Sequence, residues 1–161
     1  ILANITGVAG AFFGGRADDA KGTKFVVVTS VIVLMLSSLT IVTTSPTQAL
    51  FMSLEEGSSL PTIVFYICGG LIGAAGGALQ AASRTLMVDQ APPDRMAEAF
   101  GLYALSGRAT SFLAPLLIGI ITTATGSQQL GVAPVVGLFF IALLLLPLVK
   151  QKQPGMMSAD G

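Results

Sequence analysis

The sequence predicts an all-α membrane protein with several transmembrane helices. Three observations carry this prediction: the composition is apolar, the apolar residues form runs long enough to cross a bilayer, and the Lys and Arg residues fall between alternate runs. Of the 161 residues, 53% are hydrophobic and 10% are charged, whereas soluble domains carry about 25% charged residues. Too few charged side chains are available to cover a surface in water, so a hydrocarbon solvent is expected.

Four apolar runs have the length of a membrane-spanning helix, about 20 residues at 1.5 Å per residue. They cover residues 25–43, 61–83, 100–123 and 132–149. A fifth run, 1–13, is too short to span and is expected to be the end of a helix that begins upstream. The runs are continuously apolar rather than alternating, so transmembrane strands are not expected.

The basic residues show on which side the connectors lie. Every Lys and Arg falls in segments 14–24, 84–99 or 150–161, if Arg108 near the start of its helix is counted with the second segment. The two connectors between these segments contain no Lys or Arg. Because basic loops stay in the cytoplasm, the three segments are predicted to be cytoplasmic, including the C-terminal tail 150–161.

The composition also excludes several kinds of site. The chain has no histidine and a single cysteine, Cys68, so it offers no internal disulfide, no histidine-based catalytic triad and no common zinc site. We therefore predict no metal, no cofactor and no enzymatic activity. The formal net charge is zero, which argues against a nucleic-acid partner because the basic footprint is missing.

Glycine marks the run 61–83 as an interior helix. Gly69, Gly73 and Gly77 recur every four residues and therefore share one face. Such a stripe lets two helices pack closely in lipid, and it also allows a helix to bend. Both interpretations remain open: a packing surface, or a flexible helix beside a water-filled path.

The run 100–123 carries a similar stripe, formed by Gly107, Ser111, Pro115, Gly119 and Thr123. Pro115 removes one backbone hydrogen bond and is expected to kink the helix. This helix is therefore also placed in the interior. The bulkier and less patterned runs 25–43 and 132–149 are placed at the lipid periphery.

Two arginines lie close to the predicted membrane. Arg108 is expected about 6 Å inside the edge of the hydrocarbon. Its side chain can reach back to the interface, or it can face a cavity open to the cytoplasm. Arg84 can pair with Asp89, bind lipid phosphates, or line the same cavity. No Asp or Glu lies within any predicted span.

The first cytoplasmic connector resembles the loop signature of the major facilitator superfamily, G-x-x-x-D-R-x-G-R-K. The matching residues are Gly15, Asp19, Gly22 and Lys24, whereas Ala20 and Thr23 stand where the family often has basic residues. In that family the signature recurs in each six-helix half. With four spans downstream, this copy falls between helices eight and nine of a twelve-helix bundle.

Two further stretches resemble the vacuole-effluxer branch of the superfamily. Residues 80–86 read QAASRTL and residues 98–115 read EAFGLYALSGRATSFLAP, and members of the branch carry similar Q-A-x-S-R-S-L and E-F-F-G-L-Y-A-L-S-G-K-A-T-S-F-x-G-P runs. Ala99 replaces Phe, Arg108 replaces Lys and Ala114 replaces Gly, so the basic charge at 108 is kept.

The resemblance implies a secondary active transporter that works by alternating access. The chain is then the C-terminal part of the bundle, with the end of helix eight and helices nine to twelve. In that fold helix ten lines the cavity, eight and eleven pack against the other half, and nine and twelve face lipid. The implied partners are the lipid bilayer, the missing N-terminal half of the same chain and a small-molecule substrate. Amino acids are the family-level expectation, and the expected location is a bacterial plasma membrane.

The resemblance also suggests roles for individual residues. Asp19 is expected to hold the cytoplasmic gate shut by accepting hydrogen bonds from the other half. The residues predicted for the polar cavity wall are Tyr66, Gln80, Arg84 and Arg108. The residues predicted for helix packing or bending are Gly69, Gly73, Gly77, Gly107, Pro115 and Gly119.

Two other function classes compete with transport. The first is a small polytopic membrane scaffold or assembly subunit, which would need no further spans upstream of Ile1. The second is a membrane-embedded enzyme, which the missing histidines and the lack of an intramembrane acid pair argue against. The sequence upstream of Ile1 distinguishes a transporter from a scaffold.

Overall fold

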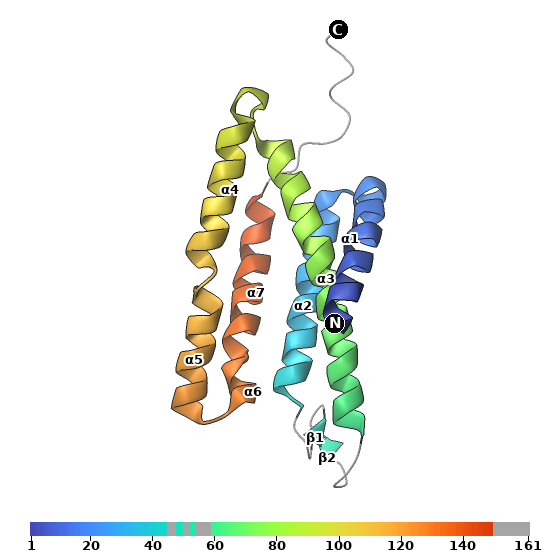
Figure 1. Ribbon diagram of the computed structural model, residues 1–161, viewed down its shortest axis with the longest axis vertical. Helices are drawn as coiled ribbons and strands as arrows, with labels where there is room; N and C mark the ends of the chain where they lie inside the picture. The colour runs from blue at the N-terminus through green and yellow to red at the C-terminus, as the bar shows by residue number, and fades with distance from the viewer. Residues whose placement is uncertain (45–47, 50–51, 54–58, 150–161) are drawn as a thin grey trace.

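The computed structural model describes residues 1–44, 48–49, 52–53 and 59–149, which form a bundle of helices (Figure 1). Its helices are α1 (Leu2–Lys21), α2 (Thr23–Val42), α3 (Leu60–Gln90), α4 (Met96–Thr110), α5 (Leu113–Thr125), α6 (Gln128–Gly131) and α7 (Ala133–Leu145), with short 3₁₀ turns η1 (Pro93–Arg95) and η2 (Leu146–Leu148). Two strands of two residues, β1 (Gln48–Ala49) and β2 (Met52–Ser53), pair antiparallel in the connector between α2 and α3. The prediction of an all-α membrane fold is confirmed.

Helices α1 and α3 lie side by side, and glycines make the contact between them. A Cβ atom at Gly77 would overlap the backbone of Gly7, and one at Gly10 would overlap the backbone of Ala74. Gly14 is buried against Ala78 in the same way. With no side chain between them, the two backbones approach closely enough for many dispersion contacts, which is how helices associate in lipid.

The glycine stripe predicted on 61–83 is therefore divided between two environments. Gly73 and Gly77 are packing positions, because a Cβ at either would overlap α1. Gly69 has no neighbouring atom within 4 Å in the described structure. Gly7, Gly10 and Gly14 of the partner helix complete the contact.

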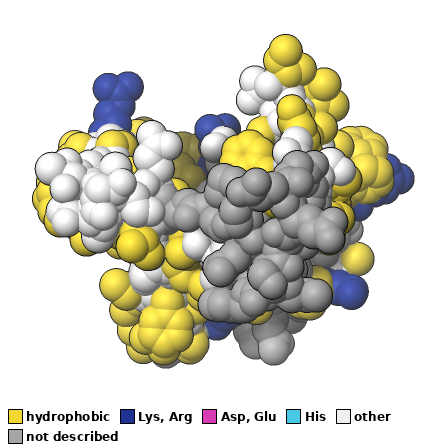
Figure 2. All heavy atoms as spheres, turned by 90° about the horizontal axis from the view of Figure 1, so that it is seen from below, with side chains coloured by type: hydrophobic (Ala, Val, Ile, Leu, Met, Phe, Trp, Pro, Cys, Tyr) yellow, Lys and Arg dark blue, Asp and Glu magenta, His cyan; other side chains and the backbone are white. Residues whose placement is uncertain are grey.

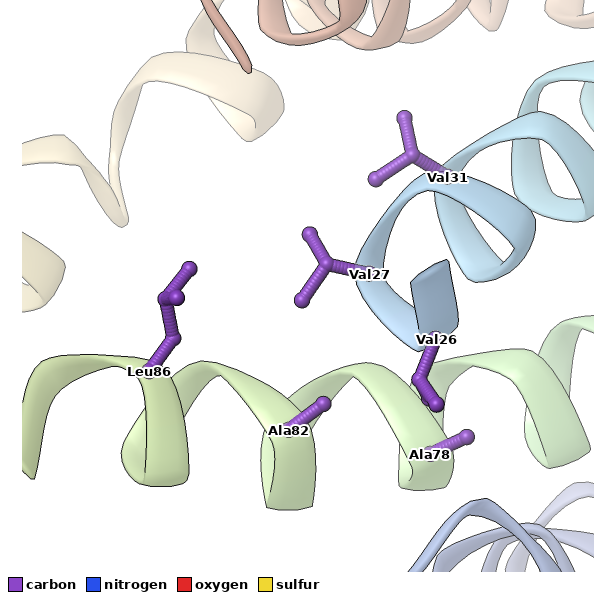
Figure 3. Packing of buried hydrophobic residues seen from close by; sticks show 6 residues of the cluster. All are labelled: Val26, Val27, Val31, Ala78, Ala82 and Leu86. Atoms are coloured by element: carbon purple, nitrogen blue, oxygen red, sulfur yellow. The ribbon is translucent and has the colours of Figure 1, made fainter. Parts of the chain in front are cut away.

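Helix α2 packs one face on α3, and the other face is open. Val26, Val27 and Val31 form a buried cluster with Ala78, Ala82 and Leu86 of α3 (Figure 3). Small polar residues share this buried face: Thr23, Ser30, Ser37 and Ser38. Phe25, Leu36 and Leu39 lie on the opposite, exposed face. Small groups inward and bulky apolar groups outward suit a helix that has protein on one side and lipid on the other.

The placement of the run 25–43 at the lipid periphery stays a prediction, because α2 buries one face against protein and exposes the other. Helix α2 has more buried residues than any other helix of the described chain, whereas α4 and α5, placed in the interior, have none. The exposed bulky side chains of α2 project mainly from one face. Its other face is small enough to fit against α3 and α7.

The predicted helix ends need correction at two places. Helix α1 continues through most of the connector 14–24 to Lys21 and ends only where Gly22 takes a left-handed φ of 85°. Helix α3 continues past residue 83 to Gln90, because Leu86 still packs against α2. A helix can extend beyond the hydrocarbon wherever a neighbouring helix gives it a surface to pack on.

The run 100–123 is interrupted rather than merely kinked. Helix α4 ends at Thr110 and α5 begins at Leu113. The carbonyl of Ser111 would normally accept a bond from the residue four positions later, and that residue is Pro115, which has no N–H. The helix therefore loses its regular geometry one turn before the proline.

Three helices are long and apolar enough to cross a membrane: Thr23–Val42, Leu60–Gln90 and Pro93–Thr125, the last counted across the interruption. The predicted fourth span, 132–149, appears as the shorter apolar helix Ala133–Leu148. It begins at Ala133, next to Pro134, and turns into a 3₁₀ helix at Leu146, next to Pro147, so a proline lies at each of these two boundaries. The chain is thus an integral, multi-pass membrane protein.

The two ends of the bundle differ in chemistry. All described acidic side chains lie at the end where α1 and α3 finish and α2 and α4 begin, which we call the charged end. The opposite end, seen from below in Figure 2, shows mostly hydrophobic side chains around the residues drawn in grey, and no acidic side chain is visible there among the described residues. Glu55, Glu56 and the tail 150–161, which completed the charge pattern of the sequence, lie outside the described residues.

Candidate functional site

A pocket of about 660 Å³ lies between α3 and α4 near the charged end. It is lined by Arg84, Phe100, Tyr103, Ala104, Ser106, Gly107, Arg108 and Ser111. Arg84 belongs to the stretch 80–86 and the other residues belong to the stretch 98–115. The two stretches that carry the strongest family resemblance therefore meet at one place in space.

A hydrogen bond between side chains joins the two helices at this pocket. The hydroxyl oxygens of Ser83 and Tyr103 are 2.8 Å apart and partly buried. Tyr103 also lines a second pocket, of about 610 Å³, whose walls include Val27 of α2, Leu86 of α3 and Val149. Tyr103 thus stands between a pocket with two arginines and a pocket with mainly apolar walls.

This hydrogen bond leads to a testable prediction. We expect Tyr103→Phe and Ser83→Ala each to lower the thermal stability of the purified full-length protein, by about 0.5–1.5 kcal/mol per lost bond. Both variants remove the same bond. The double variant is therefore expected to unfold at the same midpoint as the less stable of the two single variants. Additive losses in thermal unfolding would contradict a direct bond. Tyr66→Phe is the control, because Tyr66 is 61% exposed and no hydrogen bond of its hydroxyl is seen in the described structure.

The depth of Arg108 follows from the same hydrogen bond. Counting about 20 residues from Pro61 places the edge of the hydrocarbon near Gln80, so Ser83 and its partner Tyr103 lie close to that edge. Arg108 is about one and a half turns further along α4, which runs back into the membrane. Five residues of helix separate it from Tyr103, so it lies about 7.5 Å further along α4 and is expected deeper in the membrane by about that distance.

Arg84 and Arg108 differ from the other cations in the described part of the chain, each of which has a partner. Arg16 stacks over the Phe12 ring at 5.2 Å and Lys21 over the Phe25 ring at 4.7 Å. Lys24 donates from Nζ to the Val149 carbonyl at 2.9 Å. Arg95 forms an ion pair with Glu98 at 3.7 Å.

No described residue forms an ion pair, hydrogen bond or ring contact with the guanidinium of Arg84 or of Arg108. Both side chains line the pocket. Of the four residues predicted for a cavity wall, the structure therefore brings these two together.

The other two predicted wall residues lie elsewhere. Tyr66 is near the start of α3, at the end opposite the charged end, and its ring lies 6.5 Å from that of Phe65. Gln80 is exposed about one turn before Ser83 on the same face of α3. Neither residue lines the pocket.

The predicted loop signature has a structural explanation at two of its positions. Gly22 takes the left-handed conformation that separates α1 from α2, and its N–H donates to the Asp18 carbonyl at 2.8 Å. Lys24 binds the carbonyl of Val149 at the end of η2, where the helix dipole favours a cation. The signature thus ties the α1–α2 junction to the end of the last described helix.

The other two positions of the signature carry no contact within the described part of the chain. Asp19 is exposed on the last turn of α1, and a Cβ atom added at Gly15 would meet no described atom within 4 Å. Both lie in helix rather than in the predicted loop, because α1 continues to Lys21.

The second small-residue stripe is open. A Cβ at Gly107 or Gly119 would meet no described atom within 4 Å, and Pro115 is exposed. Three glycines of α1 that contact α3, Gly7, Gly10 and Gly14, are absent from the residues predicted from the sequence. Their close spacing along the run 1–13 and just beyond it is the signal that points to them.

Comparisons with known proteins give the family. A model of the family described as "Vacuole effluxer Atg22 like" matches residues 1–158. An uncharacterized MFS-type transporter, YxiO, from Bacillus subtilis is 31% identical over 91 residues, which are 56% of this chain and 21% of the relative. Autophagy-related protein 22-2 from Neosartorya fischeri, like its namesake from Aspergillus fumigatus, is 32% identical over 97 residues, or 55% of this chain and 15% of the relative.

This chain spans only about a fifth or less of the length of these relatives. No solved structure matches the chain significantly. The family match nevertheless covers nearly every residue, including both stretches that line the pocket. The chain therefore belongs to the Atg22-like vacuole effluxer family, within the MFS-type membrane transporters.

Proposed function

We propose that this chain is the C-terminal part of a secondary active transporter that moves a small solute by alternating access. The observation that carries the proposal is the pocket between α3 and α4, where the two family stretches meet and two arginines, unpaired within the described chain, face a shared space. An intramembrane cation without a structural partner is a candidate for a solute path. The α4–α5 segment, with no buried residue, would pack against the missing N-terminal half.

Amino acids are the solutes we propose first. The support is the family, because two relatives carry the autophagy-related name and the family description names a vacuole effluxer. The charged end would lie in the cytoplasm, as would the tail after Val149, since the basic residues gather on that side. The resemblance to the Bacillus protein supports a bacterial plasma membrane.

The direct test is transport by the full-length protein in proteoliposomes. We expect preloaded vesicles to exchange at least one labelled amino acid from a mixed panel faster than protein-free vesicles. A correctly inserted protein that exchanges no solute would instead favour a membrane scaffold or assembly subunit.

The proposed gate residue gives a second transport prediction. Asp19 lies on the exposed last turn of α1 at the charged end, where its carboxylate can accept a hydrogen bond from the other half. Removing its charge in Asp19→Asn would weaken the closed state by about 1 kcal/mol, or roughly fivefold in its population. We expect slower exchange with unchanged membrane insertion, and Asp94→Asn in the connector after α3 is the matched control. Equal exchange rates for Asp19→Asn and the unmodified protein would remove the gate role.

A further inference from the structure

The pocket between α3 and α4 contains positive charge without an acidic counterpart. Arg84 and Arg108 are the only titratable groups other than Tyr103 among its lining residues. Both guanidinium groups lack a partner in the described part of the chain, whereas the other four described cations are each engaged. A cationic ligand would therefore be repelled, and an anionic ligand would be attracted.

The serine hydroxyl groups of the pocket already donate hydrogen bonds, so the arginines are the main donors available to a ligand. The Ser106 hydroxyl donates to the Tyr103 carbonyl at 2.9 Å, and the Ser111 hydroxyl donates to the Arg108 carbonyl at 2.8 Å. Their protons are thus already used within this segment. The free donors that line the space are guanidinium N–H groups, which match the two oxygens of a carboxylate or phosphate.

The membrane strengthens the attraction at Arg108. This residue is expected about 7.5 Å deeper in the membrane than the Ser83–Tyr103 hydrogen bond, where the surroundings screen charge less than water does. An unpaired guanidinium at that depth is unfavourable. An anion that enters the pocket would relieve this cost, and Arg84 would meet the anion closer to the charged end.

Resting on the proposed transport function, we propose that this pocket binds an anionic group of the transported solute, a carboxylate or phosphate held between Arg84 and Arg108. Arg108 is the deeper binding residue and Arg84 is the residue nearer the mouth. Phe100 and Ala104 supply apolar wall beside the charged pair. The pocket volume of about 660 Å³ is enough for a small organic acid.

The binding test uses the full-length protein in nanodiscs of phosphatidylcholine, which has no net charge. Thermal unfolding is followed with succinate, with inorganic phosphate and with the uncharged analogue succinamide, at one ionic strength set with sodium chloride. We expect succinate or phosphate to raise the unfolding midpoint and succinamide to leave it unchanged. If neither anion raises the midpoint, the inference is overturned.

Matched variants assign the effect to the pocket. Arg108→Gln and Arg84→Gln are each expected to weaken the apparent affinity for the anion about tenfold to a hundredfold. Arg108→Lys keeps the charge but not the paired donors and should lose less than Arg108→Gln. Arg95→Gln is the control, because Arg95 lies in η1, is paired with Glu98 and does not line the pocket. An effect of Arg95→Gln equal to that of Arg108→Gln would mean nonspecific attraction and would overturn the inference.

The phosphate of an anionic lipid headgroup is the second source of an anionic group for this pocket. The measurement is repeated in nanodiscs that contain phosphatidylglycerol. If phosphatidylglycerol stabilises the protein through Arg84 and Arg108 while the soluble anions do not, the pocket holds a lipid headgroup and the solute site is overturned. If a carboxylate of the missing half occupies the pocket, no anion will bind, Arg108→Gln will lower the midpoint in the absence of ligand, and the inference is again overturned.

Transport distinguishes this inference from the proposed function. Exchange of uncharged solutes that is insensitive to Arg84→Gln and Arg108→Gln would overturn the anion site and leave the transporter intact. Anion binding that depends on both arginines, with no exchange of any solute, would support the site and overturn the proposed function.

Discussion

Gly77→Leu is expected to prevent stable folding of the full-length protein. At this position α1 and α3 are in backbone contact, and even a Cβ atom would overlap the Gly7 carbonyl. A leucine side chain would force the helices apart and break the neighbouring contacts of Gly10 and Gly73 as well. We expect a loss of about 3 kcal/mol or more, seen as a lower unfolding midpoint and aggregation during purification in detergent.

Gly76→Leu is the matched control for this experiment. It makes the same substitution one residue earlier on the same helix, where an added Cβ meets no described atom within 4 Å. The two glycines lie about 100° apart around α3, so only Gly77 faces α1. The milder pair Gly77→Ala and Gly76→Ala should separate in sign, because Ala is favoured over Gly in an open helix by about 1 kcal/mol. Equal losses at both positions would show that α1 is not the partner.

Pro115→Ala is expected to make α4 and α5 one continuous helix and to slow transport. The alanine N–H can donate to the Ser111 carbonyl and remove the reason for the interruption after Thr110. We expect slower hydrogen exchange across residues 111–115 and a higher unfolding midpoint. If the interruption allows α5 to move relative to α4 during the cycle, exchange of solute should fall about tenfold, which corresponds to about 1.4 kcal/mol.

Pro134→Ala is the control for the proline experiment. Pro134 stands in the first turn of α7, where a helix has no intrahelical partner for the missing N–H. Neither hydrogen exchange nor transport is expected to change there. A faster rather than slower transport rate in Pro115→Ala would mean that the interruption hinders the cycle, and the hinge role would be wrong.

The membrane class of this protein can be predicted from composition and charge order alone. Apolar runs of about 20 residues leave few alternatives to a membrane-spanning helix. Helix α2 contains most of the predicted run 25–43, and α3 contains the predicted run 61–83. The family can also be predicted from the stretches at 80–86 and 98–115. These features are local in the chain, so they require no knowledge of contacts.

The glycines of α3 show what the local sequence does not determine, namely which of them contact another helix. Gly69, Gly73 and Gly77 look equivalent in the sequence because they share a spacing of four. Only Gly73 and Gly77 of these three contact α1 in the described structure. The partner glycines of α1 are present in the sequence, but a contact requires two surfaces and their register.

The candidate site shows the same limit. The sequence groups Arg84, Arg108, Tyr66 and Gln80 because they are polar residues in or beside the two helices predicted to lie in the interior. The structure keeps Arg84 and Arg108 in one pocket and places Tyr66 at the other end of α3. The extension of α3 to Gln90 and the Ser83–Tyr103 bond set the register of α4 on α3, and a hydropathy pattern contains neither.

The sequence by itself determined that the chain lies in a membrane, which family it belongs to, and that its basic residues gather between alternate apolar runs. These properties follow from residue type and order, because the solvent preference of a side chain depends little on its neighbours. Only the tertiary structure decided which glycines are contacts, which face of α2 is buried, and which two arginines share a pocket. Those properties depend on how helices distant in the chain align. That alignment rests on the glycine contacts between α1 and α3, on the apolar cluster between α2 and α3, and on the hydrogen bond between α3 and α4.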